Sequence, residues 1–537
     1  MDDEVAAILR RADALKAARA NFDWHWQEVA DFVLPSREFT RSTSPGTKRT
    51  ARIFNTAPVL ACEQLAGGLH GMLTSPALRW FSLRVWDAGL AQDDEAKAWF
   101  ADATDRLYEH FNSQVAGFAT AAHEFYLDIA AFGTAVMYVP DLGRLGAGYR
   151  AVPLAECFAS EGSGGRIDTL FRCWKWPVRN VVETWPDTAG ADLKKRATEK
   201  PDELLDLIHA VEPRRPGEKG TAWTSTYLVR SPQIVLERGG YRDFPFVVAR
   251  WTKRSGEIYG CGAGMNALPD VKLLNKIEET ALRAGQKVVD PPLMVPDDGF
   301  LNPLDTRPGG VNVFRAGMVG ENDRIMPMQT GARPDLGEKM ADRAEARVKS
   351  TFYADWMNLP RQPNMTATEV IQRRDEMLRL MGPMVSRLTA EMLAPIIERS
   401  FRIHFENGLF APIPRHLAGA EWRVEYLSPL AVSQKSNDAD AVLRWFTVAS
   451  QMAAVDPTVL DAMDMGEASR FLADRYNAPP SIMRSREEAA ARGAARDQMA
   501  QQAAEAQQAE TMARTVKTGA QAVGELAGAA AEAPAGA

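Results

Sequence analysis

The sequence has few of the residues that most often carry chemistry. Of its 537 residues only four are cysteines and seven are histidines. No two cysteines form a CxxC pair and no two histidines stand at ligand spacing, so the sequence predicts neither a disulfide framework nor a metal site. We expect the cysteines to be reduced, buried small residues: Cys62, Cys157, Cys173 and Cys261.

Long hydrophobic runs are also missing. No apolar run reaches the roughly 18 residues that a transmembrane helix needs. The N-terminal segment 1–16 is amphipathic and has no apolar core, which argues against a secretion signal. We therefore expect a protein that is used inside a cell, or in a particle assembled there.

Sequence motifs for catalysis are absent as well. The chain has no GxxxxGK[ST], HExxH or GxSxG, so nothing predicts that it hydrolyses ATP or is an enzyme, and no cofactor is expected. Three short stretches weakly resemble binding motifs, but ordinary structure explains each of them better. Gly260–Gly264 is read as a turn before a helix, and Trp24-His25-Trp26 as a partly exposed core cluster rather than a platform for bases. The carboxylate pairs Asp93-Asp94 and Asp297-Asp298 are read as turn or helix-cap residues rather than a metal site.

Length and patterning predict an α+β, predominantly helical protein of two to four structural units. Helices are expected over 1–75, interrupted by a polar loop over 37–54, and over 93–132, with a strand over 81–86. Short strand-like runs follow between 133 and 252, together with a helix over 192–212. The net charge of −7 argues against a surface that grips nucleic acid everywhere, but it allows nucleic acid to pass.

A charged helix is predicted over 265–289. It must end at Asp290-Pro291-Pro292, because the residue before a proline avoids the α region and two prolines force an extended exit. Apolar residues gather on one face of this helix, and a basic stripe lies on a neighbouring face. The stripe consists of Lys272, Lys276, Arg283 and Lys287.

A second charged helix is predicted over 335–356, with Lys339, Arg343 and Arg347 at intervals of four. The two helices are either solvated amphipathic helices or antiparallel rods that hold a small β-containing module, 290–334, between their ends. In the second case, copies could pack side by side in a ring. Each exposed ion pair is worth under about 1 kcal/mol, but a ring repeats it.

A further helix begins at the capping box of Thr366 and Glu369 and extends towards Asn407, with kinks expected at Pro383 and Pro395. Beyond Ser428 the pattern is mostly helical. From Glu487 onwards the chain is rich in Ala, Gln and Glu, which predicts an exposed helix, a helix packed on copies of itself, or partial disorder.

Three blocks of the sequence resemble the head-to-tail connector, or portal, proteins of short-tailed bacteriophages. They are ARIFNTAPVLACEQLAGGLHGMLTSPALRWFSL (51–83), YGCGAGMNALPDVKLLNKIEETALRAGQKVVDPPLMVPDDG (259–299) and NMTATEVIQRRDEM (364–377). The resemblance runs in order from about Trp24 to about Leu430. It implies a dodecameric ring at one capsid vertex, through which a separate terminase pumps the genome.

The resemblance also implies a division of the chain into named parts. The wing would be 1–264 and 366–430, the stem helices 265–289 and 335–356, the clip 290–334, and the crown 431–537. Residues 357–365, with Arg361, would hold the place of the tunnel loop. Arg361 and the seven basic residues of the two stem helices are therefore candidates to face DNA.

Partners follow from the same resemblance. They are other copies of the chain, the major capsid protein, a scaffolding protein, the terminase large subunit, tail adaptor or nozzle proteins, internal core or ejection proteins, and double-stranded DNA. The expected location is the portal vertex of the virion, after assembly in the bacterial cytoplasm. Two other interpretations stay open: a multimeric virion or tail component without a DNA bore, and a nucleic-acid-processing enzyme.

Overall fold

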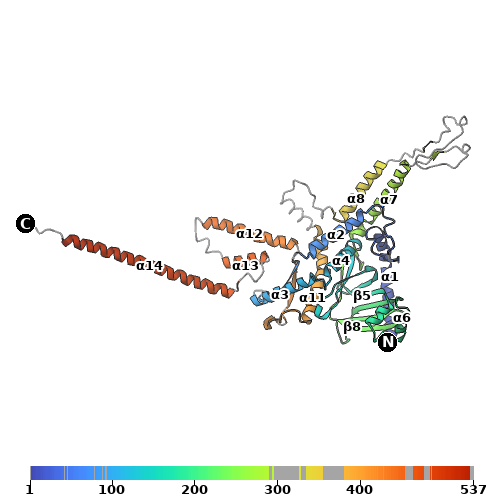
Figure 1. The fold of residues 1–537 in the computed structure, drawn as a ribbon, viewed down its shortest axis with the longest axis horizontal. Helices are drawn as coiled ribbons and strands as arrows, with labels where there is room; N and C mark the ends of the chain where they lie inside the picture. Colours follow the sequence, from blue (N-terminus) through green and yellow to red (C-terminus); the bar gives the residue numbers. More distant parts are fainter. Residues whose placement is uncertain are drawn as a thin grey trace, which may run out of the picture. The chain divides into compact units, whose positions relative to one another are not determined.

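The computed structural model describes residues 2–289 (apart from 42, 45, 78, 88, 91 and 92), 293–294, 326–327, 334–354, 380–426 (apart from 418 and 420), 429–453, 464–476, 484 and 486–531. The chain divides into two units. The first comprises Met1–Asp87 and Trp99–Ala431, and the second comprises Ala88–Ala98 and Val432–Ala537. Figure 1 shows the elements in the colours of the sequence.

The N-terminal helices form as the sequence predicts. α1 spans Asp2–Phe32 and α2 spans Ala57–Leu73. α3 spans Asp94–Phe111 and α4 spans Phe118–Phe132. The predicted helix over 93–132 is therefore two helices, because Gly117 adopts the left-handed region at φ 68° and starts a new helix.

Antiparallel strands follow α4. A three-stranded sheet has the order β3-β2-β9, with β2 at Thr134–Tyr138, β3 at Arg150–Val152 and β9 at Phe246–Arg250. A five-stranded sheet has the order β4-β5-β6-β7-β8. Its strands are Cys157–Glu161, Ile167–Pro177, Leu204–Pro213, Trp223–Val229 and Ile234–Tyr241.

The five-stranded sheet is covered on both faces. On one face, Ile8 and Ala12 of α1 pack with Phe158 and Phe171. On the other face, the short helices α5 (Val178–Thr184) and α6 (Gly190–Glu199) pack on a second apolar cluster. This arrangement leaves the central strand with little solvent contact.

The predicted helix over 192–212 is wrong in its second half. α6 ends at Glu199, before Pro201, and the chain continues as strand β6. Leu205 and Leu207 of β6 face the α5–α6 side, whereas Ile208 and Ala210 face α1. A strand that is buried on both faces has no simple alternation of apolar and polar residues, so its sequence can be mistaken for a helix.

A two-stranded sheet joins distant parts of the first unit. β1 (Phe81–Val85), which the sequence predicts, pairs antiparallel with β14 (Trp422–Tyr426), which it does not. The helical path before β14 begins, within the described residues, at 380 and continues to Glu406. It is interrupted by a π-helical turn at Thr389–Leu393, followed by α11 (Ala394–Glu406).

The second unit is helical, as predicted for the C-terminal region. α12 spans Pro429–Ala453, α13 spans Met465–Arg475 and α14 spans Arg486–Ala531. Within the described residues of the chain, no helix combines the length and the apolar character needed to cross a membrane.

Candidate functional site

Two long helices of the first unit lie side by side (Figure 1). α7 spans Ala263–Val289 and α8 spans Pro334–Thr351. Their buried residues recur at helical spacing: Val271 and Leu274 on α7, and Ala341, Ala344 and Val348 on α8. Buried apolar side chains at three- and four-residue intervals give each helix one apolar face, so these charged sequences can still pack against the rest of the unit.

The ends of this helix pair differ slightly from the prediction. α7 starts two residues before 265 and ends at Val289, the residue before Asp290. α8 ends at Thr351 and not at 356, since Tyr353 adopts the left-handed region at φ 56° and stops the helix. Between the two helices, β12 (Leu293–Met294) pairs antiparallel with β13 (Met326–Pro327). The capping-box pair and the Asp-Pro-Pro exit lie outside the described residues: Thr366, Glu369, Asp290, Pro291 and Pro292.

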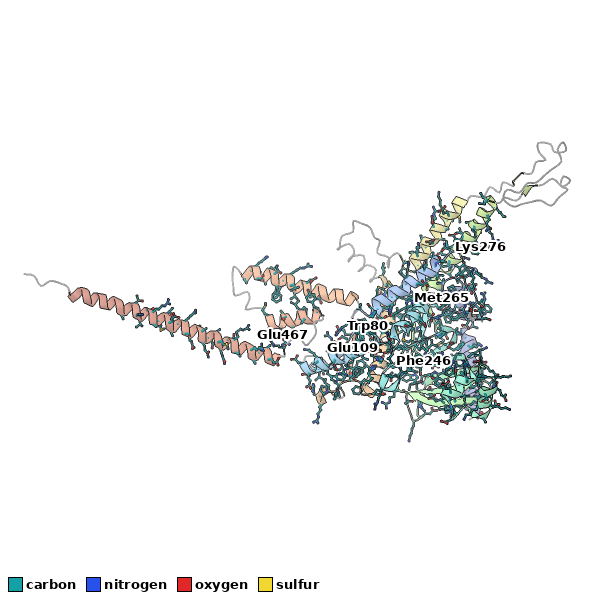
Figure 2. The ribbon with its side chains drawn as sticks, viewed as in Figure 1. Trp80, Glu109, Phe246, Met265, Lys276 and Glu467 are labelled. Carbon is teal, nitrogen blue, oxygen red and sulfur yellow. The ribbon has the colours of Figure 1, made fainter. Side chains whose placement is uncertain are left out.

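The basic side chains predicted on α7 are exposed, and three of the four have carboxylate partners. Figure 2 marks Lys276 on this helix. Glu279 forms ion pairs with Lys276 at 3.1 Å and with Arg283 at 2.6 Å. The hydrogen bond from Lys276, with the charge of Arg283, lowers the pKa of Glu279. Lys272 pairs with Glu28 of α1 at 2.7 Å.

Lys287 completes the α7 stripe and is exposed near the end of the helix. On α8, Lys339 and Arg343 are exposed, and Arg347 pairs with Asp270 of α7 at 2.9 Å. The structure thus places seven of the eight predicted basic candidates on the helix pair, and the eighth, Arg361, lies outside the described residues. Carboxylates compensate several of these charges, so the surface is mixed in sign.

The base of α7 is built from glycines at points of close contact. β10 (Thr252–Lys253) and β11 (Gly260–Cys261) pair just before the helix. A Cβ on Gly262 would lie 2.5 Å from the backbone N of Gly133, and one on Gly264 would lie 2.6 Å from the carbonyl O of Ala131. The run Gly260–Gly264 therefore lets the start of α7 pack on α4, and the absence of side chains there has a packing reason.

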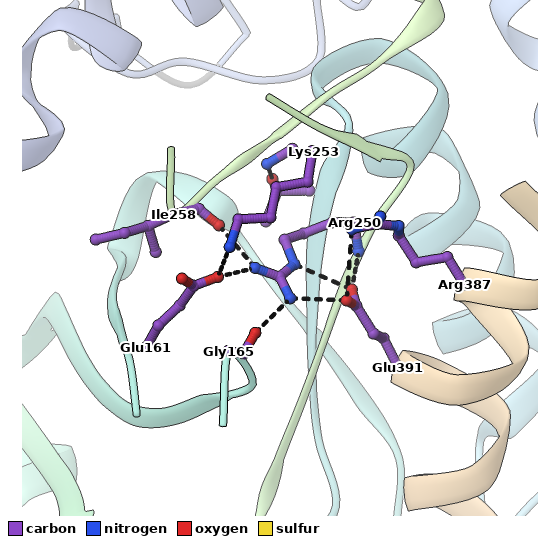
Figure 3. Close-up of polar contacts among 9 residues, drawn as sticks. Glu161, Gly165, Arg250, Lys253, Ile258, Arg387 and Glu391 are labelled. Atoms are coloured by element: carbon purple, nitrogen blue, oxygen red, sulfur yellow. Dashed lines mark hydrogen bonds and ion pairs between the residues drawn. The ribbon is translucent and has the colours of Figure 1, made fainter. Parts of the chain in front are cut away.

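Arg250 lies next to this base and joins several segments (Figure 3). Its side chain is 3% exposed. It donates to both carboxylate oxygens of Glu391, at 3.1 and 2.7 Å, and to the carbonyl oxygens of Ile258 and Gly165, at 3.2 and 3.1 Å. It also pairs with Glu161. One guanidinium therefore holds the β9 strand, the β4–β5 turn and the π-helical turn together.

The charges in this cluster balance. Burial alone would lower the pKa of Arg250, but the hydrogen bonds and charges of Glu391 and Glu161 raise it overall. Partial burial raises the pKa of Glu161, whereas the hydrogen bonds from Lys253 and Arg250 lower it overall. The Lys253–Glu161 contact is 2.5 Å. Arg250 and Glu161 are therefore both held in their charged forms near neutral pH.

This Arg250 cluster, defined as Arg250, Lys253, Glu161 and Glu391, lies next to both helices at the base of the pair. Lys253 lies on β10, which pairs with β11 before α7. The Trp251 ring lies 6.2 Å from that of Tyr353, just after α8. This cluster could not be predicted from the sequence, because its members come from separate segments of the chain and form no local motif.

The loop between α1 and α2 is fastened to α7. Asn275 accepts from the backbone N–H of Phe54 at 2.7 Å and donates to the carbonyl O of Arg52 at 2.9 Å. Asn55 donates to Glu278 at 3.1 Å. The predicted loop is therefore ordered against the helix pair by amide side chains that satisfy its backbone groups.

The described residues contain no group of three or more His, Cys, Asp or Glu side chains that could hold a metal ion. Three cysteines are buried and Cys173 is partly buried, and all four are free thiols. Trp26 is fully buried, whereas Trp24 is 69% exposed, so the predicted core cluster holds only in part.

Comparisons with known proteins give the chain a family. Two curated relatives span most of it: the "Probable portal protein" of Bordetella phage BPP-1 is 29% identical, covering 89% of this chain and 88% of the relative, and the "Portal protein" of Salmonella phage epsilon15 is 25% identical, covering 96% of each. Solved structures from a virion of a native gene transfer agent and from the neck of an empty gene transfer agent particle match at 10% identity, with TM-scores of 0.38 and 0.36. They cover 83% and 75% of this chain and 99% and 92% of theirs. Residues 5–483 match the family described as bacteriophage head to tail connecting protein, and the chain belongs to that family.

Proposed function

We propose that this chain is the subunit of a phage portal. Copies form a dodecameric ring at one capsid vertex, and DNA passes through its bore during packaging and ejection. The observation that carries the proposal is the close pair α7 and α8, with exposed basic side chains, in a chain of the connector family. The chain itself acts as a channel and docking platform, without catalysis.

Exposed apolar side chains support self-association. On α12, Trp445, Val448 and Met452 are 53%, 53% and 56% exposed in the single chain. They recur at three- and four-residue intervals and form one stripe on the helix. Large apolar groups exposed in a row mark contact surfaces, and in a ring the neighbouring subunit would cover them.

The charges of the helix pair support a bore through which DNA slides. Each phosphate that a protein neutralises adds affinity by counterion release, so a densely basic channel would hold DNA fast. Here Glu279 pairs with two of the basic residues of α7, and Asp270 pairs with Arg347 of α8. The remaining exposed cations would attract DNA weakly and let it move.

The parts of the subunit follow from this proposal. α7 and α8 are the stem, and the segment between them is the clip, where the terminase docks and tail adaptors later replace it. Residues 1–264 and 366–430 are the wing, 357–365 the tunnel loop, and 431–537 the crown. The capsid, scaffolding and internal core or ejection proteins are the remaining partners, and the ring assembles in the host cytoplasm.

A packaging assay with stem variants tests the DNA-facing role. The triple variant Lys276→Gln, Arg283→Gln, Lys287→Gln should form rings but package or retain less DNA. The matched control is Arg179→Gln with Lys195→Gln, two exposed cations on α5 and α6. Normal packaging by the stem variant, with the control also normal, would contradict a role for these side chains in the channel.

Two other functions make different predictions. A virion or tail component without a DNA bore would form a ring with a different number of subunits or no ring, and would not contact terminase. A nucleic-acid-processing enzyme would show metal-dependent nuclease activity. Incubation of the purified protein with double-stranded DNA and Mg²⁺ distinguishes the enzyme, because a portal leaves the DNA intact.

A further inference from the structure

Two histidines of the first unit, 294 residues apart in the sequence, are in contact in the folded chain. The rings of His110, in the last turn of α3, and His404, on α11, have centroids 4.4 Å apart at an angle of 73°. His404 is 3% exposed and His110 is half-buried. Nothing in the proposed channel function uses this pair.

Hydrogen bonds fix where each ring carries its proton. Nε2 of His110 lies 2.6 Å from the carbonyl O of Ala147, and Nδ1 of His404 lies 2.8 Å from the carbonyl O of Ser400. A carbonyl oxygen only accepts, so each of these nitrogens must be the donor. A second proton would therefore enter at Nδ1 of His110 or at Nε2 of His404.

The loop 141–149 is pressed against both rings. Gly146 adopts φ 81°, and a Cβ there would lie 2.7 Å from Nε2 of His404 and 3.0 Å from Cε1 of His110. The loop is also held by Asn407, which donates to Asp141 at 2.9 Å, and by the Tyr149–Ser400 hydroxyl contact at 2.6 Å. Nε2 of His404 thus faces loop backbone at close range, in a buried place.

The groups around His110 and His404 would poorly compensate the positive charge of a protonated ring. From α3 the neighbour of His404 is His110 itself, which disfavours a second cation. From the loop, Asp141 favours the cation, and Tyr149 lies beside His110 with its hydroxyl on Ser400. Burial outweighs Asp141 and lowers the pKa of His404 to about 4, and burial also lowers the pKa of His110. Both rings are therefore neutral at pH 7.

We propose that His110 and His404 form an acid-responsive fastener, in which protonation of either ring releases the loop 141–149 from α3 and α11. The released state binds the extra proton more readily, because its imidazoles are hydrated and apart. Near neutral pH the contact is complete. As the pH falls below about 6.5, the open state binds protons that the closed state does not bind, so the equilibrium constant for opening increases.

Hydrogen exchange read by mass spectrometry on the full-length protein tests this proposal. Protection of peptides covering 141–149, corrected for the intrinsic rate, should fall between pH 7 and pH 4.5, by about tenfold per pH unit for each extra proton that the open state binds. Peptides of α7, a helix without histidine, report on the rest of the unit and should change less. This measurement does not depend on ring formation, so its outcome neither supports nor contradicts the proposed portal function.

Two variants and a control make the test specific. His404→Phe and His110→Phe keep an aromatic ring in place and remove one titrating group each. In a folded variant the acid-induced loss of protection should shrink, while His123→Phe, which alters the separate His70–His123 contact at 6.5 Å, should behave like the wild type. The proposal is overturned if the loop keeps its protection at pH 4.5 in the wild type, or if protection is lost equally across the unit. It is also overturned if both folded variants, His404→Phe and His110→Phe, lose as much protection in acid as the wild type.

Discussion

Glu391, in the π-helical turn Thr389–Leu393, accepts hydrogen bonds from the backbone N–H of Arg250 at 2.9 Å and from its Nη2 at 2.7 Å. The turn precedes Pro395, which has no N–H for the helical ladder. A π-turn accommodates one extra residue in a helix, and here it presents the Glu391 carboxylate to a buried arginine. The helix before the turn is thereby fastened to the base of the α7–α8 pair.

Arg250→Lys should destabilise the protein strongly. Lysine cannot bond both oxygens of Glu391 and also reach Glu161, Gly165 and Ile258, so buried acceptors lose their partners. We expect a loss of about 3 kcal/mol, the range for a broken buried ion pair, seen as a lower thermal midpoint. Arg106→Lys, in the exposed pair with Asp102, is the control and should change stability by less than about 0.5 kcal/mol. Equal midpoints for the two variants would show that the cluster is not structural.

Gly262→Ala should disturb the base of α7. Its Cβ would meet backbone atoms of Gly133, Ile129 and Ala130 at 2.5 to 3.0 Å, and backbone cannot swing aside. The expected loss is about 1–3 kcal/mol or a failure to fold.

Gly71→Ala is the matched control, since a Cβ on this α2 residue meets nothing within 4 Å. It should be neutral or stabilising by up to about 1 kcal/mol, because alanine favours a helix. Chemical denaturation compares the two variants. A Gly262→Ala protein as stable as the wild type would mean that the glycine run serves some purpose other than packing.

Acid should weaken the five-stranded sheet through His209. This buried residue bonds Ser225 at 3.0 Å, and burial lowers its pKa to about 3. The unfolded chain therefore binds one more proton than the folded chain between about pH 6.5 and about pH 3, and stability falls with falling pH in that window. The slope from this group is about 1.4 kcal/mol per pH unit. In His209→Phe, the unfolding free energy should depend less steeply on pH in this window. An unchanged slope would show that His209 does not cause the loss of stability in acid.

Arg361→Ala is expected to impair DNA packaging or retention without affecting ring assembly. The reason is the family resemblance, which puts residues 357–365 at the place of a loop that faces DNA. Lys195→Ala, an exposed cation on α6, is the control. If the Arg361 variant formed no rings, its side chain would belong to a subunit contact and the DNA-facing assignment would be wrong.

Much of the fold could be predicted from local patterns. The strands β2, β5, β7, β8 and β9 carry alternation or β-branched runs bounded by Gly and Pro, and the end of α7 at Val289 follows from Asp290-Pro291-Pro292. β6 escaped prediction because both of its faces are buried. β14 escaped because its partner, β1, lies more than 300 residues away.

The contacts that organise the base of the helix pair are not visible in the sequence. Arg250, Glu161 and Glu391 come from three segments and become a cluster only through folding. The same is true of His110 and His404, which look isolated along the chain. The basic stripes were predicted by spacing, but their partners, such as Glu28 for Lys272, depend on how α1 packs on α7.

Mass photometry of the purified full-length protein, with negative-stain imaging of the same sample, decides whether the chain forms a portal ring. We expect a hollow dodecameric ring, and the α12 variant Trp445→Glu with Val448→Glu should shift the population towards free subunits. A stable monomer or dimer at high concentration would contradict the portal assignment and favour a component without a DNA bore.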